Sequence, residues 1–240
     1  MTEERTTAAA PSHSRNGTTL RHIAFIVDGN RRWARHHGVG IDEGHRQGIL
    51  KIPAVLGWCD ELAIPMATFW ILSIRNLTER GHEEIAGLFR VYEELAAHLS
   101  ASRWPVRVIG FLDLLPAHLA DAYTELEAQT RGRPGSQANI ALAYDGRQEI
   151  VHAIRSLATA ADPCPQVDEE ILQSHLLTAG LPDPDLILRT SGEQRLSGFM
   201  TWQSAHTELY FCDSHWPDFT KEDFQDAVRS YHTRERRYGK

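Results

Sequence analysis

The amino-acid sequence predicts an α/β protein with a parallel sheet of six strands flanked by helices. Three observations lead to this fold class. Six short runs of mostly apolar residues are spread along the 240 residues, segments with helical periodicity separate most of them, and polar sequences follow several of them. Strands that are apolar along their whole length and alternate with helices are typical of parallel sheets covered on both faces.

The first third of the domain supplies two strands and two helices. The apolar run His22–Val27 ends in a polar turn, which is typical of a buried strand that enters a loop. A short helix is predicted to begin within Arg31–Ala34, and Gly44–Leu62 carries apolar residues at helical spacing. The apolar run Pro65–Leu72 is the second predicted strand.

The middle of the chain continues this alternation. A polar loop, Ser73–His82, is predicted to lead into the helix Glu83–Ser102, whose apolar residues recur every three or four positions. Val106–Gly110 is the third predicted strand, Leu119–Thr130 is a helix, and Ala138–Tyr144 is the fourth strand.

The last third adds two strands and three helices. Arg147–Thr159 and Asp168–Ala179 are predicted helices, Asp185–Arg189 and Glu208–Phe211 are the fifth and sixth strands, and Lys221–Arg236 is the closing helix. Residues 1–20 lack an apolar core and are rich in small polar residues. We therefore expect a disordered amino-terminal tail followed by one domain over residues 21–240.

Composition excludes several classes of function. The formal net charge of −7 argues against general nucleic-acid binding, which usually requires a basic face. The sequence has no apolar run near the ~20 residues that a membrane-spanning helix needs. The cysteines Cys59, Cys164 and Cys212 are too widely spaced for a disulfide framework or a zinc cluster. Reduced thiols are the default in the cytosol, so we expect a cytoplasmic protein.

Polar sequences at strand ends are the site candidates, because ligands of open parallel sheets bind outside the carboxyl ends of the strands. The first strand is followed by Asp28-Gly29-Asn30-Arg31-Arg32-Trp33. Gly29 permits a tight turn and a close approach of the backbone to a ligand. The two arginines suit phosphate oxygens, and a helix that begins here directs its first N–H groups at an anion.

The fifth strand is followed by a loop suited to a diphosphate. Its sequence, Arg189-Thr190-Ser191-Gly192-Glu193-Gln194-Arg195-Leu196-Ser197, combines two guanidinium groups, hydroxyl donors and a glycine. The sequence contains no GxxxxGK[ST] or GxGxxG motif, so neither a P-loop nor a dinucleotide fingerprint is predicted. Asp28 and Glu208 are the best carboxylate pair for a hard divalent ion that bridges phosphate oxygens.

Four segments resemble the cis-prenyltransferase family, which includes undecaprenyl diphosphate synthase and the short-chain Z,E-farnesyl diphosphate synthases. They are HIAFIVDGNRRWA at residues 22–34, ALAYDGRQEI at 141–150, PDLILRTSGEQRLSGFMTWQ at 184–203 and TELYFCDSHWPDF at 207–219. The tail Arg237-Tyr238-Gly239 also resembles the family's RxG motif. The resemblance spans roughly residues 21–240 and is greatest to actinobacterial short-chain members.

This resemblance implies a homodimer on a six-stranded, mostly parallel sheet with a hydrophobic tunnel. The implied reaction joins isopentenyl diphosphate to an allylic diphosphate with a new cis double bond, and the implied cofactor is Mg²⁺. Neither a nucleic-acid partner nor a membrane span is implied, although peripheral contact with a membrane is compatible with it. The physical logic agrees, because magnesium, arginine and helix-start amides all stabilise a leaving diphosphate.

The resemblance also assigns residue roles. Asp28 and Asn76 are the implied catalytic residues: Asp28 serves magnesium and the allylic diphosphate, Asn76 assists proton removal, and Glu208 binds magnesium with isopentenyl diphosphate. The allylic diphosphate is implied to contact Asn30, Arg32 and His45, and isopentenyl diphosphate to contact Arg189, Arg195 and Ser197. The other predicted substrate-binding residues are Gly29, Arg31, Trp33, Ser73, Arg75 and Arg80.

The sequence departs from the family's pattern after the second strand. The family usually reads FSTENW followed by an arginine, whereas this chain reads LSIRNL at residues 72–77. Ile74 and Arg75 replace Thr and Glu, and Arg80 is displaced by one position because Glu79 aligns with the family's arginine. Two further departures are Ile41, where many members carry an arginine, and Asp145, which replaces the first glycine of YGGR.

These departures leave three hypotheses open. The first is a regular enzyme that makes a short cis-prenyl diphosphate of about C10–C20. The second strand supplies Trp70, Ile71 and Leu72, and a bulky Ile71 would block the start of a tunnel at the position where long-chain members commonly carry a small alanine. The second is an irregular enzyme that couples dimethylallyl diphosphate head-to-middle to a lavandulyl-type skeleton. The third is a non-catalytic partner subunit of another prenyltransferase.

Overall fold

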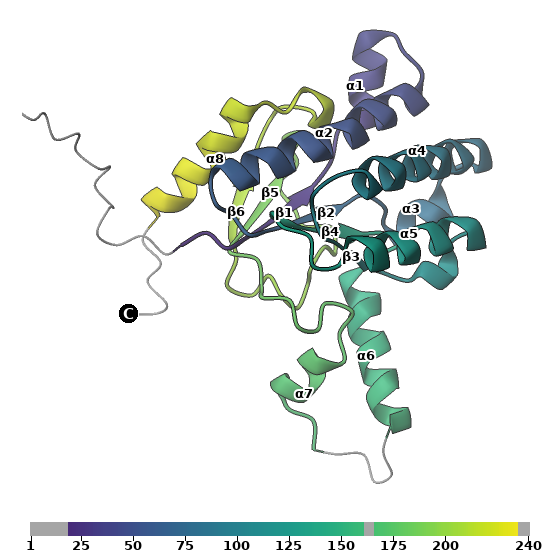
Figure 1. Ribbon diagram of the computed structural model, residues 1–240, viewed down its shortest axis with the longest axis vertical. Coiled ribbons are helices and arrows are strands. Elements are labelled where there is room, and N and C mark those ends of the chain that lie inside the picture. Colours follow the sequence, from purple (N-terminus) through teal and green to yellow (C-terminus); the bar gives the residue numbers. More distant parts are fainter. Residues whose placement is uncertain (1–18, 161–165, 235–240) are drawn as a thin grey trace, which may run out of the picture.

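The computed structural model describes residues 19–160 and 166–234 of the chain, and it confirms the predicted fold class. Six strands form one sheet in the order β3-β4-β2-β1-β5-β6, and every neighbouring pair within the described residues is parallel (Figure 1). The strands are β1 (His22–Ile26), β2 (Met66–Trp70), β3 (Val106–Ile109), β4 (Gln137–Ala141), β5 (Leu186–Arg189) and β6 (Glu208–Phe211).

Helices lie on both sides of this sheet, as Figure 1 shows. One face is covered by α2 (Ile41–Glu61), α4 (His82–Ser100), α5 (Ala117–Thr130) and α8 (Lys221–Thr233). Towards the other face lie α6 (Gly146–Ala160), which projects from the body of the molecule, and α7 (Glu169–Ser174). The remaining elements are α1 (Asn30–His37), α3 (Ile74–Glu79) and the 3-10 turns η1 (Leu112–Leu114) and η2 (Trp216–Asp218).

Alternation of side chains along the strands divides the core into two parts. Ile23 and Phe25 of β1 enter the larger core under the helical layer, whereas Ala24 and Ile26 enter a smaller core on the opposite face. The Phe25 ring stacks on the Phe69 ring of β2 with the centroids 5.0 Å apart. Full burial of such a side chain stabilises the fold by roughly 1.5–3 kcal/mol, so the strand ends that carry the site are firmly placed.

Several predicted boundaries are wrong. The segment predicted as a polar loop contains α3, because the Ser73 hydroxyl accepts a hydrogen bond from the Asn76 N–H (3.0 Å) and caps this helix. The helix predicted over Asp168–Ala179 ends at Ser174. There the Thr178 N–H donates to the buried carboxylate of Glu149 (3.0 Å) instead of continuing the helix.

The ends of the domain also differ from the prediction. Leu20, predicted to belong to the tail, is buried in the larger core, so the domain begins before residue 21. The closing helix ends at Thr233. Residues 1–18 of the tail, Cys164, the last two residues of the predicted closing helix and the Arg237-Tyr238-Gly239 motif lie outside the described residues. Among the described helices, none is both long and apolar enough to cross a membrane.

A buried polar chain crosses the sheet near its amino edge. The imidazole of His22 bonds through Nδ1 to the Pro182 carbonyl (2.8 Å) and through Nε2 to the Thr68 hydroxyl (2.7 Å), which also accepts from Asn139 (2.9 Å). Burial lowers the pKa of His22 from 6.5 to about 4, against smaller opposing effects of the Pro182 carbonyl and Asp185. A neutral imidazole with its proton on Nδ1 satisfies all of these contacts.

The low pKa of His22 predicts acid sensitivity of the fold. Because this pKa is lower in the folded than in the unfolded chain, the unfolded chain binds more protons between pH 6.5 and about 4. Stability should therefore fall as the pH drops through this window, by about 3 kcal/mol from His22. Urea unfolding at pH 7.5 and 5.0 should show about 2 kcal/mol of this loss, because pH 5.0 lies inside the window. His22→Gln should flatten this dependence, whereas His82→Gln, at an exposed site, should not.

Candidate active site

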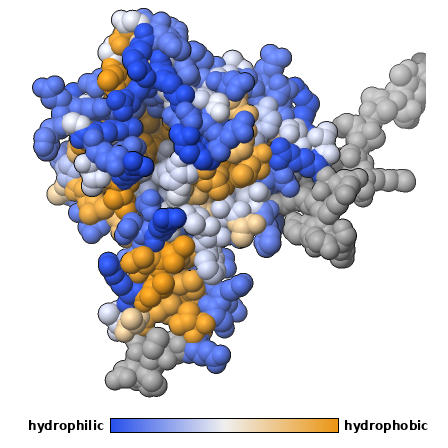
Figure 2. Space-filling view, turned by 180° about the vertical axis from the view of Figure 1, so that it is seen from behind, coloured by the Kyte–Doolittle hydropathy of each residue, from blue (hydrophilic) through white to orange (hydrophobic). Residues whose placement is uncertain are grey.

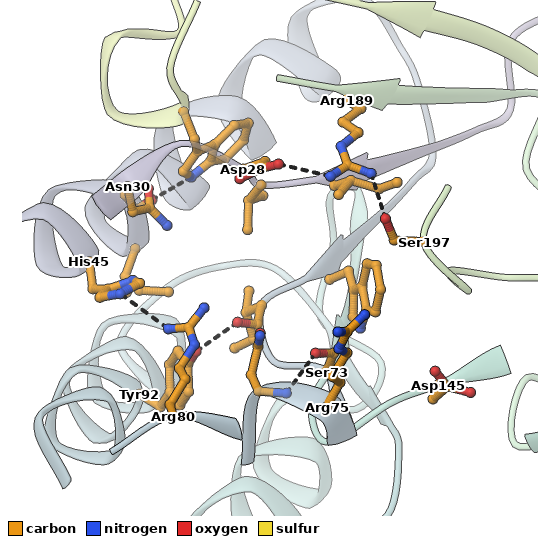
Figure 3. A pocket seen from close by; sticks show the side chains of 18 of the residues that line it. Asp28, Asn30, His45, Ser73, Arg75, Arg80, Tyr92, Asp145, Arg189 and Ser197 are labelled. Atoms are coloured by element: carbon orange, nitrogen blue, oxygen red, sulfur yellow. Dashed lines mark hydrogen bonds and ion pairs between the residues drawn. The ribbon is translucent and has the colours of Figure 1, made fainter. Parts of the chain in front are cut away.

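A cavity of about 360 Å³ lies at the carboxyl edge of the sheet. The strand β1 has β2 as its neighbour on one side and β5 on the other. The strand order therefore reverses at β1, and the cavity lies at the carboxyl end of this strand. Open α/β sheets bind ligands at such a point. Ten predicted site residues line it: Asp28, Asn30, His45, Ser73, Arg75, Asn76, Arg80, Arg189, Arg195 and Ser197. Figure 3 labels all of them except Asn76 and Arg195.

Asp28 and Arg189 form the central ion pair of this cavity. Arg189 Nη2 donates to Asp28 Oδ2 (2.9 Å), and the Gly29 N–H donates to Asp28 Oδ1 (2.7 Å). Arg189 is almost fully buried, at 4% exposure, whereas the Asp28 side chain is 31% exposed and accessible from the cavity. Burial costs a guanidinium several kcal/mol unless it is paired, so Asp28 both supports Arg189 and presents a carboxylate to a ligand.

The loop after β5 wraps around the Arg189 guanidinium. Arg189 Nη1 donates to the Ser197 hydroxyl (2.9 Å) and to the Arg195 carbonyl, while Nε is buried without a partner. The loop turns back on itself through positive φ angles at Ser191 (77°) and Ser197 (54°). The Arg195 side chain remains 59% exposed and pairs with Glu193. The loop therefore places two guanidinium groups and a hydroxyl at one end of the cavity.

The turn before α1 lies against this loop. Gly29 adopts a positive φ of 105°, and a Cβ there would lie 3.0 Å from both the Ser191 hydroxyl and the His215 ring, so only glycine fits. Asn30, the first residue of α1, carries a buried side-chain oxygen without a hydrogen-bond partner. This oxygen lies only 2.4 Å from where a Cβ on Gly48 would be, which shows how closely α1 packs against α2.

A second cavity of about 460 Å³ adjoins the first and is strongly basic. Gly29, Arg31 and Arg32 line it, and Asp28, Asn30, His45, Arg80 and Arg195 line both cavities. Burial and the neighbouring Arg80 and Arg31 lower the pKa of His45 to about 3. His45 is therefore neutral at physiological pH, and its Nε2 accepts a hydrogen bond from Arg80 Nη1 (3.3 Å).

Two predicted site residues, Trp33 and Glu208, line neither of these two cavities within the described part of the chain. The Trp33 indole donates to Asp218 Oδ1 (2.7 Å) and stacks on the His37 ring, so it packs against η2 and within α1. Glu208 opens β6 opposite Leu186, at the amino edge of the sheet, and accepts from Arg234 Nη1 (2.7 Å). It lies three residues, about 10 Å, before the strand ends at the level of Arg189. The predicted metal pair of Asp28 and Glu208 is therefore not formed within this chain.

Several cavity residues were not predicted as site residues from the sequence. Tyr92 of α4 lines the cavity and donates from its buried hydroxyl to the Ile71 carbonyl (2.6 Å). Asp145 lines it too and caps α6 by accepting from the Arg147 N–H (3.0 Å) and the Gln148 N–H (3.1 Å). Trp216 completes the wall. The pattern of residues within one helix does not show which distant elements it contacts. Of these residues, only Asp145 could have been identified from the sequence, because an Asp just before a helix is a common cap.

The donor set is compatible with magnesium. Among the described residues, no three His, Cys, Asp or Glu side chains gather closely enough to hold a metal by themselves. Mg²⁺ does not need such a cage, because it keeps several waters and binds through one or two carboxylates together with substrate phosphates. Asp28, with its partly exposed carboxylate at the edge of both cavities, meets that requirement.

The fold and the site together define a protein that binds anionic, phosphate-bearing ligands. Two adjoining cavities meet at the reversal point of a parallel sheet, and their arginine side chains, hydroxyl groups and helix-start N–H groups are suited to diphosphate oxygens. The shared lining allows two ligands to lie next to one another. The comparisons with known proteins agree with this class.

A family model described as "Putative undecaprenyl diphosphate synthase" matches residues 26–239. The chain is 46% identical to a (2Z,6E)-farnesyl diphosphate synthase of Thermobifida fusca over 93% of this chain and 91% of that protein. It is 44% identical to a short-chain Z-isoprenyl diphosphate synthase of Mycobacterium leprae over 92% and 88%. The chain belongs to the undecaprenyl diphosphate synthase family of cis-prenyltransferases and is a prenyltransferase.

The fold also matches solved structures of this family. Lavandulyl diphosphate synthase from Lavandula x intermedia, solved in complex with dimethylallyl diphosphate, superposes with a TM-score of 0.86 at 35% sequence identity, over 92% of this chain and 98% of that chain. The six-stranded sheet with flanking helices predicted from the sequence is thus the architecture of the relatives.

Proposed function

We propose that this chain condenses isopentenyl diphosphate with a short allylic diphosphate, in the presence of magnesium, to a cis-prenyl diphosphate of about C10–C20. The observation that carries this proposal is the pair of adjoining cavities with a shared wall of Asp28, Asn30, His45, Arg80 and Arg195. Such a wall suits two diphosphates whose hydrocarbon parts must meet. The names of the relatives in Thermobifida fusca and Mycobacterium leprae support a short product.

In the proposed reaction the C1–O bond of the allylic substrate breaks, and diphosphate leaves with the bonding electrons. The double bond of isopentenyl diphosphate attacks C1, and transfer of a proton from its C2 to an oxygen of the released diphosphate forms the cis double bond. Arg32, Arg80 and the first N–H groups of α1 stabilise the charge on the leaving diphosphate. Arg189, Arg195 and Ser197 hold the diphosphate of the second substrate. The side chain of Asn76, which lines the first cavity, assists proton removal.

Magnesium, when bound, neutralises and polarises diphosphate oxygens. Asp28 is the carboxylate that holds it in this proposal. Glu208 is not assigned to the metal here, because it lies at the opposite edge of the sheet in this chain.

An assay of the purified protein tests the proposal. Magnesium and dimethylallyl, geranyl or farnesyl diphosphate are supplied with and without isopentenyl diphosphate, and the products are hydrolysed and their skeletons assigned. We expect a regular cis product only when isopentenyl diphosphate is present. Absence of turnover in every combination would instead support the partner-subunit hypothesis.

A second candidate is irregular head-to-middle coupling to a lavandulyl-type skeleton. The structural match to lavandulyl diphosphate synthase supports it, together with Arg75 and Glu79, two departures from the family's pattern that line the first cavity. Both reactions use the same diphosphate contacts, so geometry at those residues does not separate them. Turnover of dimethylallyl diphosphate alone would establish the irregular reaction.

Product length should depend on Ile71. This residue lines the cavity and is 9% exposed, and its carbonyl accepts a hydrogen bond from the hydroxyl of Tyr92, which lines the same cavity. Ile71→Ala removes bulk where a hydrocarbon tunnel would continue, so we expect products at least one C5 unit longer. Chromatography of the hydrolysed products measures this. Leu77→Ala, in the neighbouring helix α3, is the matched control and should leave the product length unchanged. An unchanged product length with Ile71→Ala would refute the blocking role.

We further propose that two copies form a homodimer. Figure 2 shows an apolar patch on the projecting part of the molecule formed by α6, and Val151 and Ile154 of that helix are 38% and 53% exposed. Isolated exposed apolar residues are common, but a contiguous patch on a projecting helix favours burial by a partner. Light scattering should give twice the chain mass of 27.1 kDa, and Ile154→Glu should shift the protein towards that single mass.

A further inference from the structure

Glu84, in the first turn of α4, is the common partner of three basic side chains around the second cavity. Its Oε1 lies 3.1 Å from Arg80 Nη1, 3.6 Å from Arg31 Nε and 3.8 Å from His45 Nε2. The Glu84 and Arg80 side chains are each only 17% exposed. One carboxylate therefore lies at the junction of α1, α2 and the start of α4.

Glu84 itself does not line either of the two cavities; it lines a separate hollow with Ile41, Asp42 and Arg90. Arg80 and His45 line both cavities, so these two side chains lie between Glu84 and the space for a ligand. An acidic side chain in that rear position holds a guanidinium from behind and leaves its ligand-facing side open. Glu84 therefore supports Arg80 from the side away from the cavities. A carboxylate that competed with a ligand for Arg80 would have to face the cavities, and Glu84 lines neither of them.

Arg80 needs such an anchor because of its place in the chain. It ends α3 in an extended conformation (φ −87°, ψ 152°), and Gly81 separates it from α4. Its Nε is buried without a partner, so Nη1 provides the contacts that orient the group: one to His45 Nε2 (3.3 Å) and one to Glu84 Oε1 (3.1 Å). The guanidinium is a charged donor in both contacts, and the contact to Glu84 is the shorter one and also joins opposite charges.

We propose that Glu84 is a positioning residue that holds Arg80 in the orientation needed to bind the allylic diphosphate. This inference rests on the proposed function of the two cavities. Glu84, four residues later in the first turn of the next helix, holds the Arg80 guanidinium at the wall shared by the two cavities. Glu84 acts through Arg80 and touches no substrate.

Three substitutions at residue 84 separate positioning from simple charge. Glu84→Leu removes the anchor, and Glu84→Asp keeps the charge but withdraws the oxygens by one methylene. Both should raise the KM for the allylic diphosphate about tenfold, the effect of losing one charge-assisted hydrogen bond, with the KM for isopentenyl diphosphate within about twofold of wild type. Glu84→Gln keeps an acceptor oxygen in place and should restore most of the affinity.

A double substitution and a neighbouring control complete the test. In an Arg80→Ala background, Glu84→Leu should cause no further rise in the allylic KM, because its effect passes through Arg80. Glu83→Leu, at the exposed preceding position of the same helical turn, should change neither KM. Additive effects of the Arg80 and Glu84 substitutions, or normal allylic KM for both Glu84→Leu and Glu84→Asp, would overturn the positioning role.

Direct binding keeps this inference separate from the proposed function. Calorimetric titration with magnesium and inorganic diphosphate requires no turnover, and Glu84→Leu should weaken that binding about tenfold. If the wild-type protein makes no prenyl product, the proposed function fails while this titration still tests Glu84. Equal affinity of wild type and Glu84→Leu for inorganic diphosphate would count against the anchor whatever the reaction proves to be.

Discussion

Replacement of Asp28 by asparagine should lower the turnover rate on the order of 10³-fold, as expected for loss of a group that stabilises transition-state charge. The amide oxygen can still accept the hydrogen bond from Arg189 Nη2, which is 2.9 Å from Oδ2 in the native protein. The negative charge is lost, however, and with it the carboxylate that faces both cavities and suits magnesium. Steady-state kinetics with saturating magnesium measure the effect.

Two further variants interpret this result. Asp28→Ala also leaves the Arg189 guanidinium, 4% exposed, without its ion-pair partner. Asp28→Ala should therefore lower the free energy of unfolding by about 3 kcal/mol. Asp28→Asn should lower it much less, because the amide oxygen still accepts from Arg189. Asp218→Asn changes an exposed carboxylate that binds the Trp33 indole, and its rate should match wild type. A near-normal rate for Asp28→Asn would show that this carboxylate is not the centre of the reaction.

Replacement of Glu149 by leucine should destabilise the fold by about 3 kcal/mol or more, because several buried donors lose their acceptor. Glu149 is fully buried and accepts from the Tyr144 hydroxyl (2.6 Å), from the N–H (3.0 Å) and hydroxyl (2.9 Å) of Thr178, and from Gln203 Nε2 (3.0 Å). Burial, and then proximity to this carboxylate, raise the pKa of Tyr144 well above its ordinary value, so the phenol remains a donor. Urea unfolding measures the loss.

The same network should influence isopentenyl diphosphate. It holds Gln203 at the far end of the loop after β5, and the Gly146 N–H at the start of α6 donates to the Gly198 carbonyl (2.8 Å) of that loop. Glu149→Gln should therefore raise the KM for isopentenyl diphosphate several-fold while the allylic KM stays near wild type.

The control for the stability of Glu149→Leu is Glu125→Leu, which replaces an exposed carboxylate by the same residue. It should alter the free energy of unfolding by no more than about 0.5 kcal/mol.

The fold was predictable because its signals are local. Each strand is a short apolar run, and a run such as His22–Val27, bounded by a polar turn, is typical of a strand in a sheet buried on both faces. The helix α3 was missed because six residues with no buried side chain show no amphipathic stripe, and only the Ser73 cap marks its start. The helix α7 was predicted too long because Thr178 is bound by Glu149, 29 residues away.

Most of the site was predictable for a related reason. Parallel strands bring their carboxyl ends to one edge, so polar residues after strands such as Asp28 and Arg189 had to meet there. Glu208 was predicted to join them, but it stands at the beginning of its strand rather than at the end. Position within a strand decides the edge at which a side chain lies, and the predicted sixth strand already began with Glu208, so its place at the amino edge followed from the sequence.

The sequence by itself determined the fold class, the family resemblance and the chemistry of the cavity wall, because apolar periodicity and residue types after strands are properties of short segments. Only the tertiary structure decided the partners. The Asp28–Arg189 pair spans 161 positions, and Glu84 meets Arg31 and His45 from separate helices. Such contacts depend on how α1, α2 and α4 pack over the sheet, and packing is set by the whole core rather than by any one segment.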